Sequence, residues 1–303
     1  MPHRTSPPIV VLLALLLLSP ASVASAQEIR RRSAATRDVW SEPNPGVRYL
    51  RRTTTTPCDV HALIVDLRAD GVRLIATRYD ERWSTVAEHA RARSLAAAVN
   101  GGFWGALQRP RGLAAGGGAL WPSAATDPEM GFFAIDTDGR PMLRAPGEEI
   151  GERELARIAE AVSGRPILLD EGAIDQSVLD AFPTANQRQP RTAIGLSEDR
   201  HTAIVVVVDG RRRTSRGMTL YELARLLAEL GAHDAINLDG GGSSEMYVGR
   251  AGGVVNVPSR GRWEIALDAA LAGESSADAE RSRAGESGRD EVFVRGVERE
   301  VLN

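Results

Sequence analysis

The stretch INLDGGGSSEMY, residues 236–247, combines residue types that suit the binding of a charged ligand. Asp239 ends an apolar run, and three glycines and two serines follow it. Successive small residues let the backbone approach a ligand and turn several N–H groups toward one point, which favours an anion. The loop is neither a Walker A loop nor a nucleophile elbow, because it contains no Gly-Lys-Ser/Thr and no Gly-x-Ser-x-Gly. A flexible turn is the alternative interpretation.

A hairpin is predicted to bring a basic residue close to a second aspartate. Residues 191–196 and 202–210 are β-rich runs joined by five polar residues. If the turn centres near Asp199, antiparallel pairing places Arg191 opposite residues 207–209. Arg191 and Asp209 would then be close neighbours.

The next segment is predicted to form a strand–helix–strand unit. Five leucines between residues 219 and 230 fall on one helical face. Thr219 with Glu222 forms a capping box, and Gly231 lies where a C-terminal cap belongs. DAINLD follows as a short buried strand. This βαβ-like spacing would make the strands that end at Asp209 and Asp239 parallel, so both carboxylates would emerge at one sheet edge, together with Arg191.

Two further stretches suit a sugar phosphate. In NGGFWG (100–105), the Asn100 amide suits a sugar hydroxyl, and Phe103 or Trp104 offers a ring face. The alternative is a simple Asn-Gly-Gly turn. DGRRRTSRG (209–217) carries four arginines, which read as a solvated basic loop or, beside an anion-binding turn, as an attractor for a phosphorylated substrate.

Other chemically able residues are weaker candidates. Asp170 and Glu171 end another strand, and because they are adjacent, at most one should face a shared site. His233 is a candidate base, although a cap or surface position is the stronger interpretation. Cys58 is the single cysteine and is read as a structural thiol, so a disulfide framework and a thiolate metal cluster are excluded. The remaining histidines considered, His61, His89 and His201, show no metal-ligand spacing.

Composition predicts the organisation of the chain. Residues 1–26 read as a cleaved secretory signal, with an uncleaved anchor as the alternative. Residues 27–38 read as an unpacked leader, 39–271 as one domain, and 272–303 as a disordered low-complexity tail. The formal net charge is −3, which gives no electrostatic reason to expect nucleic acid as a partner. We therefore expect a secreted or periplasmic protein without stable membrane insertion.

The alternation of strand signals and helical patterns predicts the fold class. The hairpins and interspersed helices, one of them expected over residues 152–163, indicate an α+β or mixed α/β fold. We expect a single layered domain with a mixed sheet, hairpins and a C-terminal βαβ-like unit.

Several of these stretches resemble, in order, the phosphodiester glycosidase family. They are NGGFW, GRPILLDEG, PRTAIGL, the long run from VVVDG to GGGSSEMY, and NVPS, and the resemblance covers roughly residues 58–270. The family hydrolyses a sugar from a glycosyl-1-phosphodiester. The sequence departs from the family pattern at Trp104 and after NVPS, where RGRWEIALDAAL follows.

The resemblance implies which residues line the cleft. They are Asn100, Gly101, Arg191, Thr192, Asp209, Arg211, Ser215, Asp239, Gly240, Gly241, Gly242, Ser243 and Ser244. We expect Arg191 and the N–H groups of residues 240–242 to hold phosphate, and Asp239 or Asp209 to act as base or nucleophile. No cofactor is required, although a divalent cation held by the two aspartates is an open alternative.

The expected substrate is a sugar phosphate or a glycan of the bacterial cell envelope. Two other functions stay open: a metal-dependent phosphodiesterase that cleaves P–O instead of C–O, and a non-catalytic module that binds envelope glycans.

Overall fold

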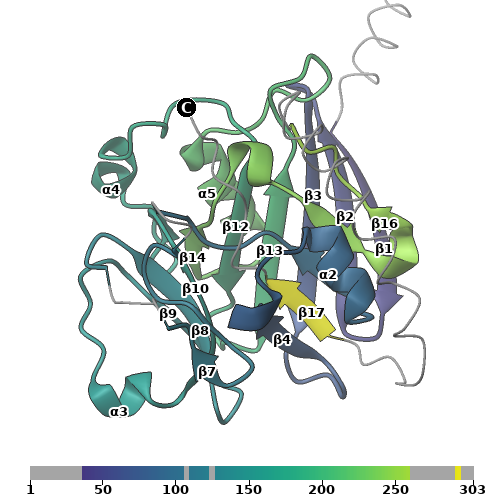
Figure 1. The fold of residues 1–303 in the computed structure, drawn as a ribbon. Helices are drawn as coiled ribbons and strands as arrows, with labels where there is room; N and C mark the ends of the chain where they lie inside the picture. The colour runs from purple at the N-terminus through teal and green to yellow at the C-terminus, as the bar shows by residue number, and fades with distance from the viewer. Residues whose placement is uncertain (1–35, 106–108, 123–126, 260–290, 295–303) are drawn as a thin grey trace, which may run out of the picture. The chain divides into compact units, whose positions relative to one another are not determined.

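The computed structural model describes residues 36–105, 109–122, 127–259 and 291–294 (Figure 1). The signal and most of the leader predicted from the sequence lie outside the described residues. The described residues are mostly β-structure with few helices, and all belong to the unit Thr36–Asn303. No helix among them is long and apolar enough to cross a membrane.

A seven-stranded sheet forms the centre of this unit, in the order β1-β2-β3-β13-β12-β14-β11. The strands are β1 (Arg37–Asn44), β2 (Val47–Thr54), β3 (Cys58–Asp66), β13 (Thr202–Val208), β12 (Arg191–Leu196), β14 (Asp234–Asn237) and β11 (Ile167–Leu169). Every neighbouring pair in this sheet is antiparallel. The expected mixed sheet is therefore wrong for the central sheet. The leader prediction is also wrong for its last two residues, because β1 begins at Arg37.

Both faces of the central sheet are covered, because alternate residues of β13 point to different cores. Val205 and Val207 belong to one apolar cluster, whereas Val206 and Val208 belong to another. The second cluster includes Leu223 and the other inward leucines of α5 (Leu220–Glu229). The first includes residues of two smaller sheets. The result is a layered arrangement, with α5 on one face of the central sheet and the smaller sheets on the other.

The strand–helix–strand unit was predicted in the right order and direction, but its two strands are not neighbours. β12 lies between β13 and β14 and is antiparallel to both. Consequently β13 and β14 still run in the same direction and end at the same sheet edge. The hairpin register is as expected, with Arg191 opposite Val208.

The two smaller sheets have five strands each. One has the order β7 (Ala119–Leu120), β6 (Ala115–Gly116), β10 (Ile158–Gly164), β8 (Gly131–Asp136) and β9 (Pro141–Arg144). The other has the order β16 (Gly253–Val254), β15 (Met246–Val248), β5 (Ala97–Val99), β17 (Glu291–Val294) and β4 (Arg73–Ala76). β17 is parallel to both its neighbours, so this third sheet is mixed.

Two expectations need correction here. β17 lies within the predicted disordered tail, so that prediction is wrong for residues 291–294. The helix expected over 152–163 is limited to α3 (Glu152–Leu155), and from Ile158 onward the chain forms β10. Pairing of β10 with β8 and β6 outweighs the local helix preference.

The remaining helical segments are short. They are α2 (Val86–Ala92), α4 (Gln176–Asp180) and the 3-10 turns η1 (Tyr79–Glu81), η3 (Gly241–Ser243) and η4 (Gly249–Ala251). Both predicted caps of α5 are present. Thr219 and Glu222 form the capping box, and Gly231, directly after the last turn, has a left-handed φ of +99°.

Candidate active site

Asp239 lies just beyond β14, and the glycine loop that follows holds its carboxylate in place. Oδ1 accepts the N–H of Gly240 at 2.9 Å, and Oδ2 accepts the hydroxyl of Ser243 at 2.7 Å. The N–H of Gly241 donates to the carbonyl of Pro190 at 3.0 Å. The N–H groups of Gly240 and Gly241 are thus used within the protein. The expected role of these two groups in holding phosphate does not fit this geometry, because the loop binds Asp239 itself.

Burial raises the pKa of the Asp239 carboxyl to about 6, against the lowering effect of its bonds from Ser243 and Gly240. The residue as a whole is half-buried. No arginine or histidine of the described residues forms an ion pair with its carboxylate. A carboxylate with a raised pKa is able to take a proton near neutral pH.

Arg211 lies directly beside the glycine loop. A Cβ placed on Gly241 would lie 3.0 Å from Nη2 of Arg211, so the guanidinium packs closely against the loop, and the φ of +71° at Gly241 favours glycine there. Nε of Arg211 donates to Oε1 of Gln189 at 2.9 Å. Arg211 has a φ of +56°, a conformation uncommon for a residue with a side chain. Within the described residues no carboxylate pairs with this exposed guanidinium, which leaves its positive charge available to an anion.

Arg191 has a different position from the one expected. Its buried guanidinium donates to three backbone carbonyls: Nε to Met218 at 3.1 Å, and Nη2 to Thr184 at 2.8 Å and to Gln187 at 2.9 Å. Burial, and then the nearby charge of Arg211, lower the pKa of Arg191 to about 10. Arg191 therefore holds the 184–190 loop, and the phosphate-binding role expected for it fits Arg211 better.

Buried polar side chains join the glycine loop to the loop after β5. Nδ2 of Asn100 donates to the carbonyl of Asp239 at 2.7 Å, and Oδ1 of Asn100 accepts the hydroxyl of Thr192 at 2.7 Å. The hydroxyl oxygens of Thr192 and Ser244 are 3.3 Å apart. The N–H of Asp239 donates to the carbonyl of Gly101 at 3.0 Å. Asn100 and Thr192 therefore fix the backbone around Asp239.

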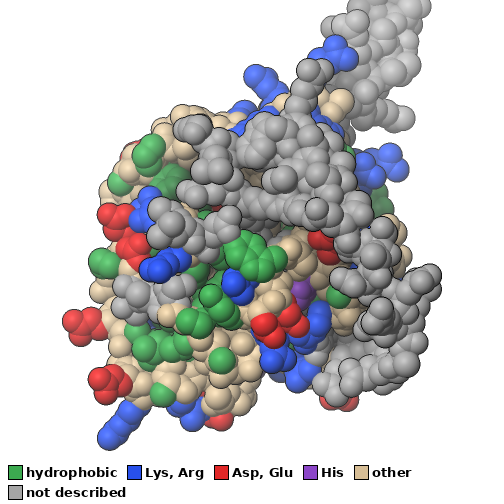
Figure 2. Space-filling view, viewed as in Figure 1, with side chains coloured by type: hydrophobic (Ala, Val, Ile, Leu, Met, Phe, Trp, Pro, Cys, Tyr) green, Lys and Arg blue, Asp and Glu red, His purple; other side chains and the backbone are tan. Residues whose placement is uncertain are grey.

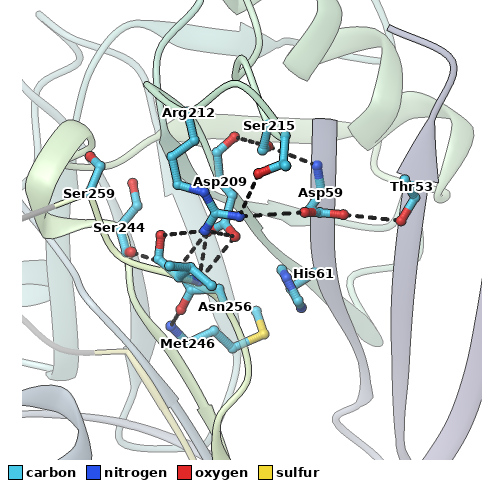
Figure 3. Close-up of polar contacts among 12 residues, drawn as sticks. Thr53, Asp59, His61, Asp209, Arg212, Ser215, Ser244, Met246, Asn256 and Ser259 are labelled. Atoms are coloured by element: carbon cyan, nitrogen blue, oxygen red, sulfur yellow. Dashed lines mark hydrogen bonds and ion pairs between the residues drawn. The ribbon is translucent and has the colours of Figure 1, made fainter. Parts of the chain in front are cut away.

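Asp209 is bound on both oxygens by the segment that follows β16 (Figure 3). Its carboxylate accepts Nδ2 of Asn256 at 2.9 Å, the N–H of Val257 at 3.0 Å and, more weakly, Nη1 of Arg212 at 3.5 Å. Burial raises the pKa of Asp209 in spite of these bonds. Nδ2 of Asn256 also donates to the carbonyl of Ser244, at 2.9 Å. Asp209 thus lies at the expected sheet edge, but its oxygens are occupied.

Ser215 is also placed in the framework. Its buried hydroxyl donates to the carbonyl of Asp209 at 2.7 Å and accepts the N–H of Asp59 at 2.9 Å (Figure 3). The substrate-binding role expected for Ser215 is not supported by these contacts. The side chain instead closes the turn that presents Arg211.

The weaker candidates lie elsewhere or are structural. The N–H of Glu171 donates to Oδ1 of Asp234 at 3.0 Å, at the opposite end of β14 from Asp239, and Cys58 is buried with a raised pKa. His61 is buried against Tyr49. Among the described residues, no group of three His, Cys, Asp or Glu side chains is placed to hold a metal ion.

Two residues of the site were missed by sequence reasoning. Asn256 fastens Asp209, Ser244 and Met246 together, and Gln189 orients Arg211. One signal for Asn256 was available, its place in NVPS. Gln189 is an isolated glutamine, and no motif marked it.

Comparisons with known proteins bear on the family and the fold of the chain. A family model described as phosphodiester glycosidase matches residues 93–271, more than half of the chain. A curated relative, the SPbeta prophage-derived uncharacterized protein YomE of Bacillus subtilis (strain 168), is 43% identical over 63 residues. That match covers 21% of this chain and only 10% of the relative, so the chain spans about a tenth of that protein.

Two solved structures share the fold. The zebrafish N-acetylglucosamine-1-phosphodiester alpha-N-acetylglucosaminidase catalytic domain, auto-inhibited by its pro-peptide, is 21% identical with a TM-score of 0.53, covering 74% of this chain and 75% of that chain. A hypothetical protein from Synechocystis is 14% identical with a TM-score of 0.51, covering 73% and 61%. These two structures show the fold, and the family match shows that the chain belongs to the phosphodiester glycosidase family.

Proposed function

We propose that this protein hydrolyses the glycosidic C–O bond of a glycosyl-1-phosphodiester, releasing a free sugar and a phosphomonoester. One observation carries the proposal: Asp239, whose carboxyl has a pKa of about 6, begins the glycine loop, and the guanidinium of Arg211, which pairs with no carboxylate of the described residues, packs against the same loop. The reaction needs a base near the anomeric carbon and a positive charge on the phosphate, and this pair supplies both.

Asp239 is the proposed base. It takes a proton from water while the water oxygen bonds to the anomeric carbon, and the C–O bond to phosphate breaks. The electron pair of that bond leaves with the phosphomonoester, which is a good leaving group because phosphate carries the charge. A carboxylate with a raised pKa is a stronger base than an ordinary one, and above about pH 6 it is still mostly ionised.

Arg211 is the proposed phosphate ligand. A guanidinium donates in a planar fork that matches two oxygens of a phosphodiester. The buried charge of Arg191 adds to the positive potential, because within the described residues no carboxylate neutralises either arginine. Asn100, Thr192 and Ser244 are proposed to position the loop, with Trp104 beside the reacting sugar.

We also propose that the enzyme acts outside the cytoplasm, on glycans or sugar phosphates of the cell envelope. The support is the N-terminal sequence, with its short apolar run and the Ala24-Ser25-Ala26 cleavage pattern.

The first experiment is a release assay on a panel of α-glycosyl-1-phosphodiesters in water enriched in ¹⁸O, with and without EDTA. Free sugar carrying ¹⁸O is expected, formed by the wild type and lost in Asp239→Asn. Label in the phosphate would mean P–O cleavage and would favour the phosphodiesterase alternative. Retained binding without turnover in the wild type would favour a glycan-binding module. Loss of sugar release in EDTA would show that a cation takes part.

A further inference from the structure

Two loops far apart in sequence leave one sheet at the same edge. β4 and β5 both run parallel to β17, and Val294 of β17 lies between Ala76 and Val99, the last residues of those strands. The chain after β4 therefore begins beside the chain after β5. The second of these loops contains Asn100 and Gly101, which contact the backbone of Asp239.

Aromatic side chains from these two loops contact Trp121, which directly follows β7, and so form a row. The ring centroids of Trp104 and Trp121 are 6.0 Å apart, and those of Trp121 and Tyr79 are 5.6 Å apart at 78°. Trp121 is buried and is held by its Nε1 bond to the carbonyl of Thr77 at 3.0 Å. These rings are thus fixed in position relative to the loop that carries Trp104.

The row becomes exposed as it leaves the site. Tyr79 is 40% exposed and Trp83 is 56% exposed. The guanidinium of Arg82 lies 3.9 Å from the ring centre of Tyr79 and 4.8 Å from that of Trp83, so it bridges the two. We name these five residues, Tyr79, Arg82, Trp83, Trp104 and Trp121, the aromatic strip. In Figure 2, hydrophobic side chains gather in the middle of the viewed face beside basic and acidic ones.

We propose that the aromatic strip is a subsite for further sugar rings, so that the substrate is an oligosaccharide or polysaccharide phosphodiester and not a single sugar unit. This inference rests on the proposed function, because it takes Trp104 as the neighbour of the reacting sugar. The inference depends on the strip being continuous with the site. The row begins at Trp104, three residues after Gly101, whose carbonyl accepts the N–H of Asp239, and it ends at the exposed rings of Tyr79 and Trp83.

The chemistry of the strip favours a saccharide as occupant. A sugar ring presents a face of C–H groups that packs on an aromatic face, and hydroxyl groups at its rim that accept hydrogen bonds from a guanidinium. A lipid chain would gain little apolar contact here, because the charged Arg82 lies between the exposed rings and the neighbouring Glu81 forms an ion pair with Arg93. Asp80, exposed on the same turn, disfavours a nucleic acid.

The test is affinity electrophoresis of the full chain through gels that contain glycol chitin, dextran or mannan. These three soluble polymers offer different neutral hexoses. We expect retardation in at least one gel for the wild type and its loss in Trp83→Ala and Tyr79→Ala. Trp40→Ala is the matched control, because Trp40 is 41% exposed and, like Trp83, has an arginine over its ring (Arg48, at 4.5 Å), but lies on β1, outside the strip. It should be retarded like the wild type.

The outcomes separate this inference from the proposed function. No retardation of the wild type in any gel, or equal retardation of Trp83→Ala and wild type, overturns the subsite even if sugar release is observed. Retardation that depends on Trp83 while no phosphodiester is hydrolysed leaves the subsite standing and overturns the proposed reaction. Circular dichroism of each variant checks that the fold is retained.

Discussion

Asp239 owes its reactivity to where the chain places it. Without the protein around it the carboxyl would titrate near 3.8, and burial raises its pKa to about 6. The hydroxyl of Ser243 and the N–H of Gly240 limit that rise because they stabilise the charged form. An aspartate of this kind is protonated in mild acid and ionised at neutral pH.

Asp239→Asn should reduce kcat by roughly 10³-fold or more, because the amide cannot take a proton from water. In the wild type, kcat/KM should fall as the pH drops below about 6, since the base becomes protonated, and should level off above it. The measurement is a pH profile of sugar release.

Ser243→Ala tests whether Asp239 is the group that titrates. Removal of a hydrogen bond that stabilises the carboxylate should raise its pKa further, so the acid limb should move to higher pH. An unchanged inflection in Ser243→Ala would assign the acid limb to another group.

Arg211→Ala should lower kcat/KM by about 10²-fold, the size expected for loss of one charged ligand of the leaving group. Arg211→Lys should restore only part of the loss, because an ammonium lacks the planar fork. Arg213→Ala is the matched control, since Arg213 is exposed in the same loop. Equal losses in Arg211→Ala and Arg213→Ala would mean general attraction by the basic loop instead of a specific contact.

At the scale of the elements, the ends of β12, β13 and β14 are held together by buried polar groups. Asp209 at the end of β13 binds Asn256 and Val257, and Asn256 binds the backbone of Ser244 and Met246. The glycine loop therefore has a fixed support in this network. Loss of the carboxylate would leave the N–H of Val257 without its acceptor and would remove one of the two acceptors of Nδ2 of Asn256.

Asp209→Ala should lower the free energy of unfolding by about 2–4 kcal/mol, because it leaves the N–H of Val257 without its acceptor, removes one acceptor from Asn256 and removes one of the two carboxylates that pair with Arg212. Asp70→Ala, at an exposed turn, should change it by less than about 0.5 kcal/mol. Urea denaturation measures both. A variant at position 209 with wild-type stability and no turnover would instead make Asp209 a catalytic residue.

At the scale of the whole molecule, the layers explain why the site is at one edge. The central sheet is buried on both faces, so its strand ends and the loops that connect them are the places open to a substrate. The third sheet adds β5 and β15, which border Asn100 and the glycine loop. The site is thus assembled from two sheets.

Export is the prediction that concerns the chain as a whole. In a secreting bacterial host the mature protein should begin at Gln27, because the Ala24-Ser25-Ala26 pattern suits a signal peptidase. Intact-mass measurement of the exported protein checks this. A protein that keeps residues 1–26 and stays with the membrane would indicate an uncleaved anchor.

By itself, the sequence determined what depends on neighbouring residues. The hairpin register at Arg191, the capping box of α5 and the shared edge of Asp209 and Asp239 follow from local periodicity and turn chemistry, and all three are present. Family membership followed from the motifs. The glycine loop was also identified from the sequence, but the partners of its N–H groups were not. Gly240 donates to the carboxylate of Asp239, and Gly241 donates to the carbonyl of Pro190.

Only the tertiary structure decided what depends on distant partners. β12 lies between β13 and β14, β10 is a strand because β8 and β6 pair with it, and β17 joins β4 to β5. The same holds for the arginines: the guanidinium of Arg191 donates to backbone carbonyls of Thr184 and Gln187, whereas that of Arg211 donates to Gln189 and pairs with no carboxylate of the described residues. A side chain's hydrogen-bond partners come from whatever the fold brings within about 3 Å, and residue type alone does not specify them.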